Sequence, residues 1–156
     1  MIVYRISKMA HIQDLSGIGA GLHGGRWNPI GINLVYTSSS IALASLEYMV
    51  HNYHLLSTAE VCLAKIKIAG VSSILEVKAG TLSRDWNLPM SQQSATQQVG
   101  KDFFLKGNKY ILKVPSAIIP QEHNLLLNPH HPHHKKTKVV EVIEPFLFDD
   151  RIINLK

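Results

Sequence analysis

The sequence predicts an α+β fold. Segments with the pattern of strands outnumber helical segments and do not alternate regularly with them, which argues against a doubly wound α/β fold. The chain has 156 residues, enough to bury most of its surface in one core, so we expect a single domain over residues 1–156. Hydrophobic residues make up 46% and charged residues 17% of the chain, a balance typical of globular proteins.

The first third of the chain is predicted to hold two strands and a helix around a long loop. Residues 2–6 alternate like a half-buried strand, and residues 33–37 form a second strand pattern. The segment between them, 12–31, is so rich in glycine that we expect an ordered loop without regular elements, and long loops in compact domains tend to be functional. Serines 38–40 can cap a helix that runs to about His54 and, being apolar on most sides, should be largely buried.

The rest of the chain is predicted to add strands and one surface helix. Residues 59–68 alternate for nearly their whole length, and residues 72–78 should pair nearby. Residues 90–106 contain helix formers and a modest apolar stripe, which predicts a polar surface helix. Three further strand patterns follow, at 110–119, 123–128 and 138–148. The histidine-rich segment 128–138 is expected to be an exposed loop.

Charge and hydropathy restrict the cellular setting. No apolar run approaches the roughly 18 residues of a spanning helix, and the N-terminus lacks a secretory signal, so we expect a cytoplasmic protein without a membrane partner. The single cysteine, Cys62, lies in an apolar stretch and is expected to be a small core residue. A net charge of +5 favours an anionic partner, which could be a nucleotide, a nucleic acid or an acidic protein surface.

Arg26 lies in a glycine-rich stretch, 21–28, that could approach a phosphate. The stretch lacks the Gly-Lys-Ser/Thr ending of a phosphate loop and the spaced glycines of a dinucleotide fingerprint. One interpretation places Trp27 in the core and Arg26 in solvent. In the other, the planar guanidinium of Arg26 binds a pyrophosphate at two points, and the glycines leave room for that ligand.

Glu47 is an acid among apolar residues of the predicted helix. Isolated acids are rarely buried without a partner or a purpose. The alternative is an ordinary pair with His51, one turn further on, and spacing alone leaves both interpretations open. The other single histidines, His23, His54 and His123, have the pattern of surface or hydrogen-bonded core groups.

Three other motifs give weaker evidence for a functional site. The histidines at 130, 131, 133 and 134 have no cysteine or carboxylate at a spacing that completes a rigid tetrahedral site, so we expect no catalytic metal. Ser116 lacks the Gly-x-Ser-x-Gly elbow of a serine nucleophile. The basic run 135–138 has no interleaved aromatic residues, so we expect no direct nucleic-acid binding.

Four segments, taken in order, resemble the RES-domain family. They are "YRI" at 4–6, "GGRWNPIGINLVYTSSSIALASLE" at 24–47, "VPSAIIPQEHNLLLNPHHP" at 114–132 and "FLFDDRI" at 146–152. The family is named for an arginine, a glutamate and a serine, which match Arg26, Glu47 and Ser116. The resemblance spans nearly the whole chain, as a single RES domain, and the histidine-rich insertion only extends the family's "NP-HP" pattern.

The resemblance implies a fold and an activity. The expected fold is similar to that of ADP-ribosyltransferases, with a split antiparallel or mixed sheet and packed helices. Proteins of this family are the toxins of bacterial toxin-antitoxin systems. The resemblance therefore implies NAD as the substrate, which these toxins degrade with water or phosphate, without a metal, while some transfer ADP-ribose to a protein. The implied partner is an antitoxin, an Xre-like helix-turn-helix protein. A non-catalytic, basic RNA-binding or interaction module remains the alternative from another class.

The implied chemistry assigns roles to five residues. Cleaving the nicotinamide–ribose bond builds positive charge on the sugar, which the carboxylate of Glu47 would stabilise. Arg26 would bind the pyrophosphate of NAD. Tyr36 could stack on the nicotinamide or hydrogen-bond to it, and Ser116 could hold the nicotinamide ribose or a phosphate. Arg5 is either a second phosphate contact or part of a structural salt bridge.

Overall fold

The sheet at the centre of the molecule has seven strands. The computed structural model of the chain describes residues 1–55, 60–88 and 94–153. The strands are β1 (Ile2–Lys8), β2 (Val35–Ser38), β3 (Val61–Lys67), β4 (Ile74–Glu76), β5 (Ile111–Pro115), β6 (His123–Leu127) and β7 (Lys138–Ile143). Their order is β4-β5-β6-β2-β1-β3-β7, in which β4 and β5 are parallel and the other neighbours antiparallel. The predicted α+β class with a mixed sheet is confirmed.

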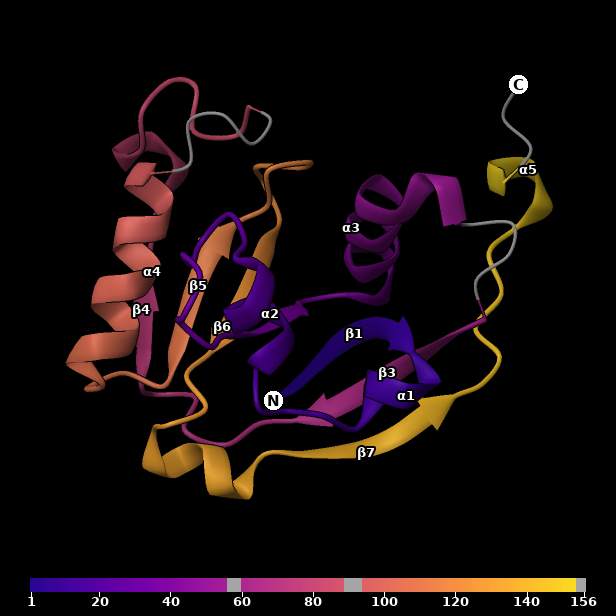
Figure 1. Cartoon of the computed structure of the whole chain (residues 1–156), viewed down its shortest axis with the longest axis horizontal. Helices are drawn as coiled ribbons and strands as arrows, with labels where there is room; N and C mark the ends of the chain where they lie inside the picture. The colour runs from indigo at the N-terminus through magenta and orange to yellow at the C-terminus, as the bar shows by residue number, and fades with distance from the viewer. Residues whose placement is uncertain (56–59, 89–93, 154–156) are drawn as a thin grey trace.

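The sheet is split between β1 and β2. These two strands share a single residue pair, Tyr4 opposite Ser38, whereas β1 pairs with β3 along its whole length, from Ile2 to Lys8. The sheet therefore separates into one half made of β4, β5, β6 and β2 and another made of β1, β3 and β7 (Figure 1). At this divergence, side chains of β1 and β2 are free to line a pocket rather than to pack against a neighbouring strand.

The helices are short apart from two. They are α1 (Met9–Ile12), α2 (Ile18–His23), α3 (Ile41–Asn52), α4 (Ser94–Lys106) and α5 (Asp150–Ile153), with 3₁₀ turns η1 (Tyr53–Leu55), η2 (Ala79–Thr81) and η4 (Pro132–Lys136). None of the helices that the structure describes is long and apolar enough to cross a membrane.

The glycine-rich segment contains a helix, α2, so the prediction of a loop without regular elements is wrong there. Glycines at both ends explain its boundaries, because Gly17 precedes it with φ 72° and Gly24 follows it with φ 71°, values that favour glycine. A third glycine serves packing. A Cβ at Gly21 would lie 1.9 Å from the side-chain oxygen of Asn33, so only glycine fits there.

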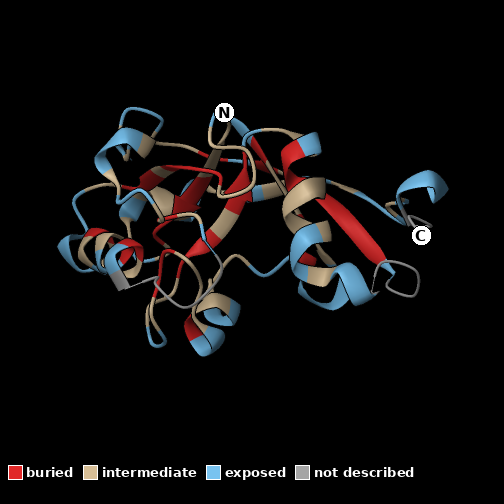
Figure 2. Ribbon diagram, turned by 90° about the horizontal axis from the view of Figure 1, so that it is seen from above, coloured by how far each residue is buried: buried red, intermediate tan, exposed pale blue. Residues whose placement is uncertain are grey.

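Helix α3 begins at the predicted cap, since Ser40 Oγ accepts a hydrogen bond of 3.1 Å from the backbone N–H of Leu43. The prediction that this helix is largely buried is wrong. Within α3, Leu43 and Ala44 are buried, and Val50 is 58% exposed. Most of the helix is coloured as intermediate or exposed in Figure 2. The helix packs on β1 and β2 where the sheet splits, so its remaining surface faces a pocket or solvent.

Helix α4 covers the half of the sheet that contains β4 and β5 (Figure 1). Phe103, from the predicted apolar stripe, is buried in a cluster with Trp27, Trp86 and Leu112. The predicted surface helix is thus confirmed over the residues of α4, and its predicted first residues, 90–93, lie outside the described part of the chain.

Three predicted strands are too long; the one predicted over 72–78 is reduced to β4, and the other two end four or more residues early. The strand predicted over 138–148 ends at Ile143, and Phe148 leaves the sheet to stack on Tyr48 of α3, with ring centroids 5.9 Å apart. The strand predicted over 110–119 ends at Pro115, where a turn begins. Apolar residues continue past both ends because they pack against α3 or in turns. Residue 59, the first of the predicted strand 59–68, is outside the described residues, and β3 holds Cys62 in the core as predicted.

The histidine-rich segment is only in part the exposed loop that we predicted: its lysines are exposed, but residues 132–136 form a 3₁₀ turn and three of its histidines are half-buried. His131 stacks on the ring of Tyr110, with centroids 5.5 Å apart. His134 Nε2 lies 2.9 Å from the carbonyl oxygen of Leu15 and its Nδ1 lies 3.1 Å from the Tyr110 hydroxyl. Tyr110 is fully buried, so its aromatic ring gives the histidines a surface on which to pack.

This packing predicts a stability loss in mild acid. Burial lowers the pKa of His131 and of His134 below the ordinary 6.5, so these histidines bind protons more readily in the unfolded chain. Their contribution to the free energy of unfolding is complete above pH 6.5 and is lost as the pH falls below that value. We expect Tm to fall between about pH 7.5 and about pH 5.5. The His134→Gln variant should show a flatter profile in calorimetry, and an identical slope in both proteins would contradict this origin.

Candidate active site

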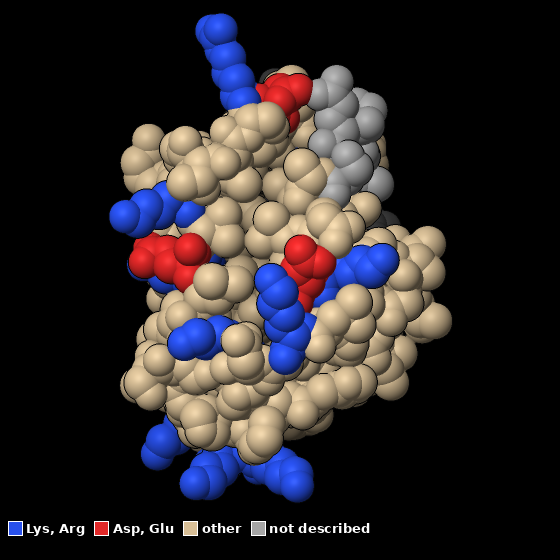
Figure 3. Space-filling view, turned by 90° about the vertical axis from the view of Figure 1, so that its left-hand side faces the viewer, with Lys and Arg blue, Asp and Glu red and all other residues tan. Residues whose placement is uncertain are grey.

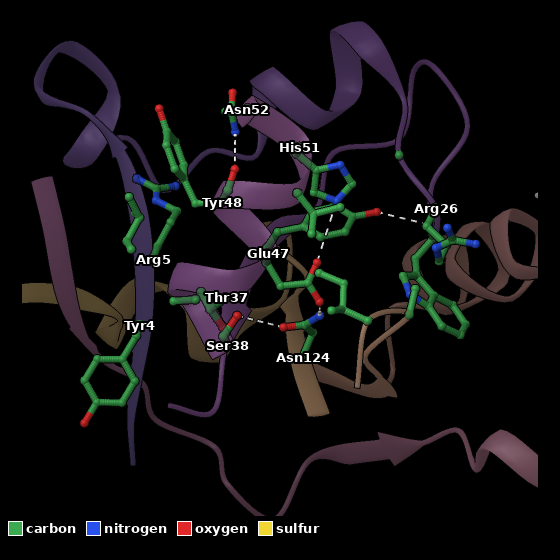
Figure 4. Close-up of a pocket in the computed structure, with 18 of the residues that line it drawn as sticks. Tyr4, Arg5, Arg26, Thr37, Ser38, Glu47, Tyr48, His51, Asn52 and Asn124 are labelled. Atoms are coloured by element: carbon green, nitrogen blue, oxygen red, sulfur yellow. Dashed lines mark hydrogen bonds and ion pairs between the residues drawn. The ribbon is translucent and has the colours of Figure 1, made fainter. Parts of the chain in front are cut away.

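A pocket of about 650 Å³ lies where the sheet splits, beneath α3. It is lined by four of the five predicted site residues, Arg5 from β1, Arg26 from the segment after α2, Tyr36 from β2 and Glu47 from α3. Figure 4 labels Arg5, Arg26 and Glu47 around the pocket. The fifth, Ser116, lies behind Glu47 and does not line the pocket. The tertiary structure thus gathers residues that are far apart in the sequence.

Glu47 is held by three side chains. Its Oε1 accepts a hydrogen bond from Ser116 Oγ at 2.9 Å. The same oxygen accepts one from Asn124 Nδ2 at 2.5 Å, and Oε2 lies 3.6 Å from His51 Nε2 (Figure 4). Burial alone would raise the pKa of Glu47, but the proximity of His51 and the hydrogen bonds from Asn124 and Ser116 outweigh it and lower the pKa. The carboxylate is therefore ionised at neutral pH. The sequence left open whether Glu47 pairs with His51 or has a functional place. In the structure it does pair with His51, and it also lines the pocket.

Arg26 is partly buried and is bound to the backbone through one nitrogen. Its Nη1 donates to the carbonyl oxygens of Trp86, at 2.7 Å, and Leu88, at 3.1 Å. Burial lowers the pKa of Arg26, and attraction to Glu47 opposes that shift, but a guanidinium stays protonated at any physiological pH. Trp27 is 3% exposed and contacts Trp86, so the predicted core position of Trp27 is confirmed.

Tyr36 holds the backbone around Arg26 in place. Its hydroxyl donates to Asn28 Oδ1 at 2.7 Å and accepts from the backbone N–H of Trp27 at 3.1 Å. A Cβ at Gly25 would lie 2.7 Å from the Tyr36 hydroxyl, which explains the glycine before Arg26. Burial raises the pKa of Tyr36, so the phenol is neutral. Its hydroxyl is already engaged, and its ring faces the pocket.

Helix α4 supports the same segment from the other side. Thr96 Oγ1 donates to the carbonyl oxygen of Arg26 at 2.7 Å, and Gln97 Nε2 donates to that of Gly25 at 3.0 Å. One turn after Thr96, a Cβ at Gly100 would lie 1.6 Å from the Trp27 carbonyl oxygen. Sequence reasoning missed this role. The sequence feature that could have indicated it is that Thr96 and Gly100, both small, are four positions apart and so lie on one face of a helix.

Arg5 caps a helix end. Its Nη2 donates to the carbonyl oxygens of His11, at 2.8 Å, and Ile12, at 2.7 Å, at the end of α1. Burial lowers the pKa of Arg5, and Asp14 raises it from a longer distance. Within the described residues Arg5 forms no ion pair shorter than 4 Å, so the predicted structural salt bridge is replaced by a bond to a helix terminus.

Ser116 and Asn124 form the floor behind Glu47. Ser116 is fully buried, and its Oγ accepts from the backbone N–H groups of Ile118 and Ile119 while it donates to Glu47. Asn124 lines the pocket, and its Oδ1 accepts from Ser38 Oγ at 2.7 Å. Asn124 was missed in the sequence, where its signal is a polar residue before three strand leucines.

The site suits a ligand that carries phosphate groups and develops positive charge at another atom. No group of three or more His, Cys, Asp or Glu side chains in the described parts of the chain is placed to hold a metal ion. The pocket combines one carboxylate, Glu47, with two guanidinium groups, Arg5 and Arg26. Such a site can bind phosphate through the arginines and stabilise a cationic centre through the carboxylate.

Known proteins resemble this chain along its length. The protein Toxin Res of Photorhabdus laumondii is 36% identical over 159 residues, covering 100% of this chain and 99% of that protein. The Prs ADP-ribosylating toxin of a Sphingobium species is 37% identical over 143 residues, covering 90% of this chain and 87% of that protein. A chain of the M. tuberculosis MbcT-MbcA toxin-antitoxin complex matches with a TM-score of 0.76 and 20% identity, over 97% of this chain and 86% of that chain.

The match to the solved structure, at 20% sequence identity, shows the fold of this chain. The family is shown by sequence, because the model of the RES domain matches residues 2–149 and the two relatives above are more than one third identical. The chain belongs to the RES domain family.

Proposed function

We propose that this protein is the toxin of a bacterial toxin-antitoxin system and that it cleaves the nicotinamide–ribose bond of NAD, with water or phosphate as acceptor. The observation that carries the proposal is the placement of one ionised carboxylate, Glu47, in a pocket that also presents Arg26 and Arg5. The names of the relatives support the toxin role, and one of them is called an ADP-ribosylating toxin.

Glu47 is suited to the bond-breaking step. As the bond to nicotinamide breaks, positive charge develops on the ribose ring, and a nearby carboxylate stabilises that state more than the substrate. Ser116 and Asn124 hold the carboxylate in place before the reaction, so little reorganisation is needed. Nicotinamide already carries positive charge in NAD and leaves as a neutral ring, which removes the need for a general acid.

Arg26 is suited to the pyrophosphate. Its Nη1 is bound to two backbone carbonyls, which fix the orientation of the guanidinium. Its remaining N–H groups form no hydrogen bond with a described residue and can bind phosphate oxygens as a fork. Arg5 is a second candidate phosphate contact, and the ring of Tyr36 a candidate surface for nicotinamide; both line the pocket.

The direct test is incubation of the purified protein with NAD, with and without phosphate, followed by mass analysis of the products. We expect loss of NAD and release of nicotinamide, with ADP-ribose or its phosphorylated form as the second product. EDTA should leave the rate unchanged, because the chemistry requires only charge stabilisation and positioning. Intact NAD would overturn the proposal, and loss of activity in EDTA with rescue by zinc would overturn the metal-free mechanism.

A second candidate uses the same site. The relative named Prs ADP-ribosylating toxin favours transfer of ADP-ribose to a protein. Radiolabelled NAD distinguishes the two, because transfer leaves label on a macromolecule and cleavage leaves it on small products. The alternative from another class, a basic RNA-binding module, predicts RNA binding that weakens steeply with salt and no consumption of NAD.

The toxin role implies a protein that restrains it, and we propose an Xre-like helix-turn-helix antitoxin. The structural match to a chain of a toxin-antitoxin complex supports a partner of this kind. A net charge of +5 favours an acidic partner, and Figure 3 shows Lys and Arg side chains gathered along the lower edge of the face that carries α4. Expression of this chain alone should lower NAD and arrest growth; normal growth and NAD content would contradict the toxin role.

Arg26→Lys is expected to raise KM for NAD by about tenfold, with a smaller change in kcat. The pyrophosphate charge is present before and during bond cleavage, so its loss weakens binding of substrate and transition state alike. Lysine keeps the charge but loses the fork and the two carbonyl contacts of Nη1. Steady-state kinetics measures the changes in KM and kcat separately, and Arg151→Lys, at an exposed arginine, is the matched control. A fall in kcat at constant KM would place Arg26 at the reacting centre instead.

A further inference from the structure

The two oxygens of Glu47 have different surroundings. Oε1 accepts two hydrogen bonds, from Ser116 and Asn124, both anchored in or beside the sheet. Oε2 faces His51 at 3.6 Å, a residue that is 70% exposed and lines the pocket. The described residues give Oε2 no other partner. One oxygen is thus fixed to the protein and the other is presented to a ligand.

The amide that holds Oε1 is itself held. Ser38 Oγ donates to Asn124 Oδ1 at 2.7 Å, and these two residues are opposite each other in the register of β2 and β6 (Figure 4). An asparagine amide can turn over and exchange its donor and acceptor. With Oδ1 bound to the serine hydroxyl, Nδ2 points to Glu47. Ser38 lines the pocket but is only 5% exposed.

We infer that Asn124 and Ser38 form a positioning relay for Glu47, which anchors Oε1 and leaves Oε2 as the oxygen that faces the reacting ribose carbon. This inference rests on the proposed NAD cleavage and names residues beyond the arginine, glutamate and serine of the family. Neutral donors suit the task. A lysine or arginine in place of Asn124 would neutralise the carboxylate, and an aspartate would repel it, whereas an amide fixes it and leaves its charge available.

The relay makes a kinetic prediction with a pH signature. Asn124→Ala should lower kcat for NAD about tenfold with KM nearly unchanged, because a hydrogen bond to a charged group is lost. The acidic limb of the kcat profile should move up by about one pH unit, since the lost donor favours the ionised form. The other charged or titratable groups that face Glu47, namely His51 on α3, Arg26 and Tyr36, are unchanged in the variant.

Ser38→Ala tests the relay itself. It should give a smaller loss than Asn124→Ala, and the double variant should be no worse than Asn124→Ala alone, because Ser38 acts only through the amide. Ser45→Ala is the matched control: it removes a serine of α3 that donates to the Ile41 carbonyl oxygen, and it should leave kcat and its pH profile unchanged. Additive losses of Ser38→Ala and Asn124→Ala would overturn the relay.

A readout that needs no NAD separates this inference from the proposed function. Carbon-13 NMR of labelled glutamate carboxyls follows the titration of Glu47, assigned with Glu47→Gln. The pKa should rise by about one unit in Asn124→Ala and by less in Ser38→Ala, and Ser38→Ala carries the test if Asn124→Ala does not fold. Absence of NAD cleavage by the parent overturns the proposed function, whereas a Glu47 titration unmoved in both variants overturns the relay.

Discussion

Glu47→Gln should lower kcat for NAD cleavage by about 100-fold or more, the range for deletion of a transition-state electrostatic group. Glutamine keeps an oxygen that can accept the hydrogen bonds of Ser116 and Asn124, so the local structure should persist. It removes the negative charge that would face the developing positive charge of the ribose. Because that charge arises only as the bond breaks, KM should change little.

The controls separate this role from a structural one. Glu141→Gln removes an exposed carboxylate that pairs with Lys65, and its turnover should match the parent. If Glu47 merely paired with His51, Glu47→Gln would lose a little stability and keep near-normal turnover. Steady-state kinetics on folded protein decides, and a Glu47→Gln protein that consumes NAD at the parent rate would remove Glu47 from the mechanism.

Gly100→Ala is expected to destabilise the fold by about 3 kcal/mol, at the upper end of overpacking effects. The added Cβ would lie 1.6 Å from the carbonyl oxygen of Trp27 and 2.8 Å from its carbonyl carbon, so α4 or the backbone beside Arg26 must move. Both atoms belong to rigid backbone, which cannot adjust as a side chain does. The hydrogen bonds from Thr96 to Arg26 and from Gln97 to Gly25 should weaken with that movement.

Gly19→Ala is the matched control for Gly100→Ala. Gly19 lies in helix α2, and a Cβ there meets nothing within 4 Å. The same substitution should therefore stabilise the protein slightly, by about 0.5 kcal/mol, through helix propensity and a less flexible unfolded chain. Urea unfolding measures both variants. A Gly100→Ala protein as stable as Gly19→Ala would show that α4 does not press on the arginine segment.

Helices and strands were predictable where a local pattern is decided by local contacts. The strand at β3 and the serine cap of α3 were both predicted, because strand propensity and a cap hydrogen bond act within a few residues. The alternating exposure predicted for β3 is wrong, since its first four residues are all buried. Failures occurred where burial depends on distant partners. The apolar face of α3 is open because the sheet splits beneath it, and the histidine-rich segment is packed because Tyr110, from β5's side of the core, lies under it.

The sequence by itself determined the α+β class, the resemblance to the RES domain family, and the candidate residues Arg26, Glu47 and Ser116. It could not determine how these residues meet, since they come from separate elements that are brought together by the packing of α3 on the sheet and by the pairing of β6 with β2 and β5. The tertiary structure decided that Ser116 lies behind Glu47, and that Asn124 supplies the second donor to its Oε1. The physical reason is that a carboxylate's charge and orientation are set by donors within about 3 Å in space, and strand register brings those donors together from positions that no sequence period connects.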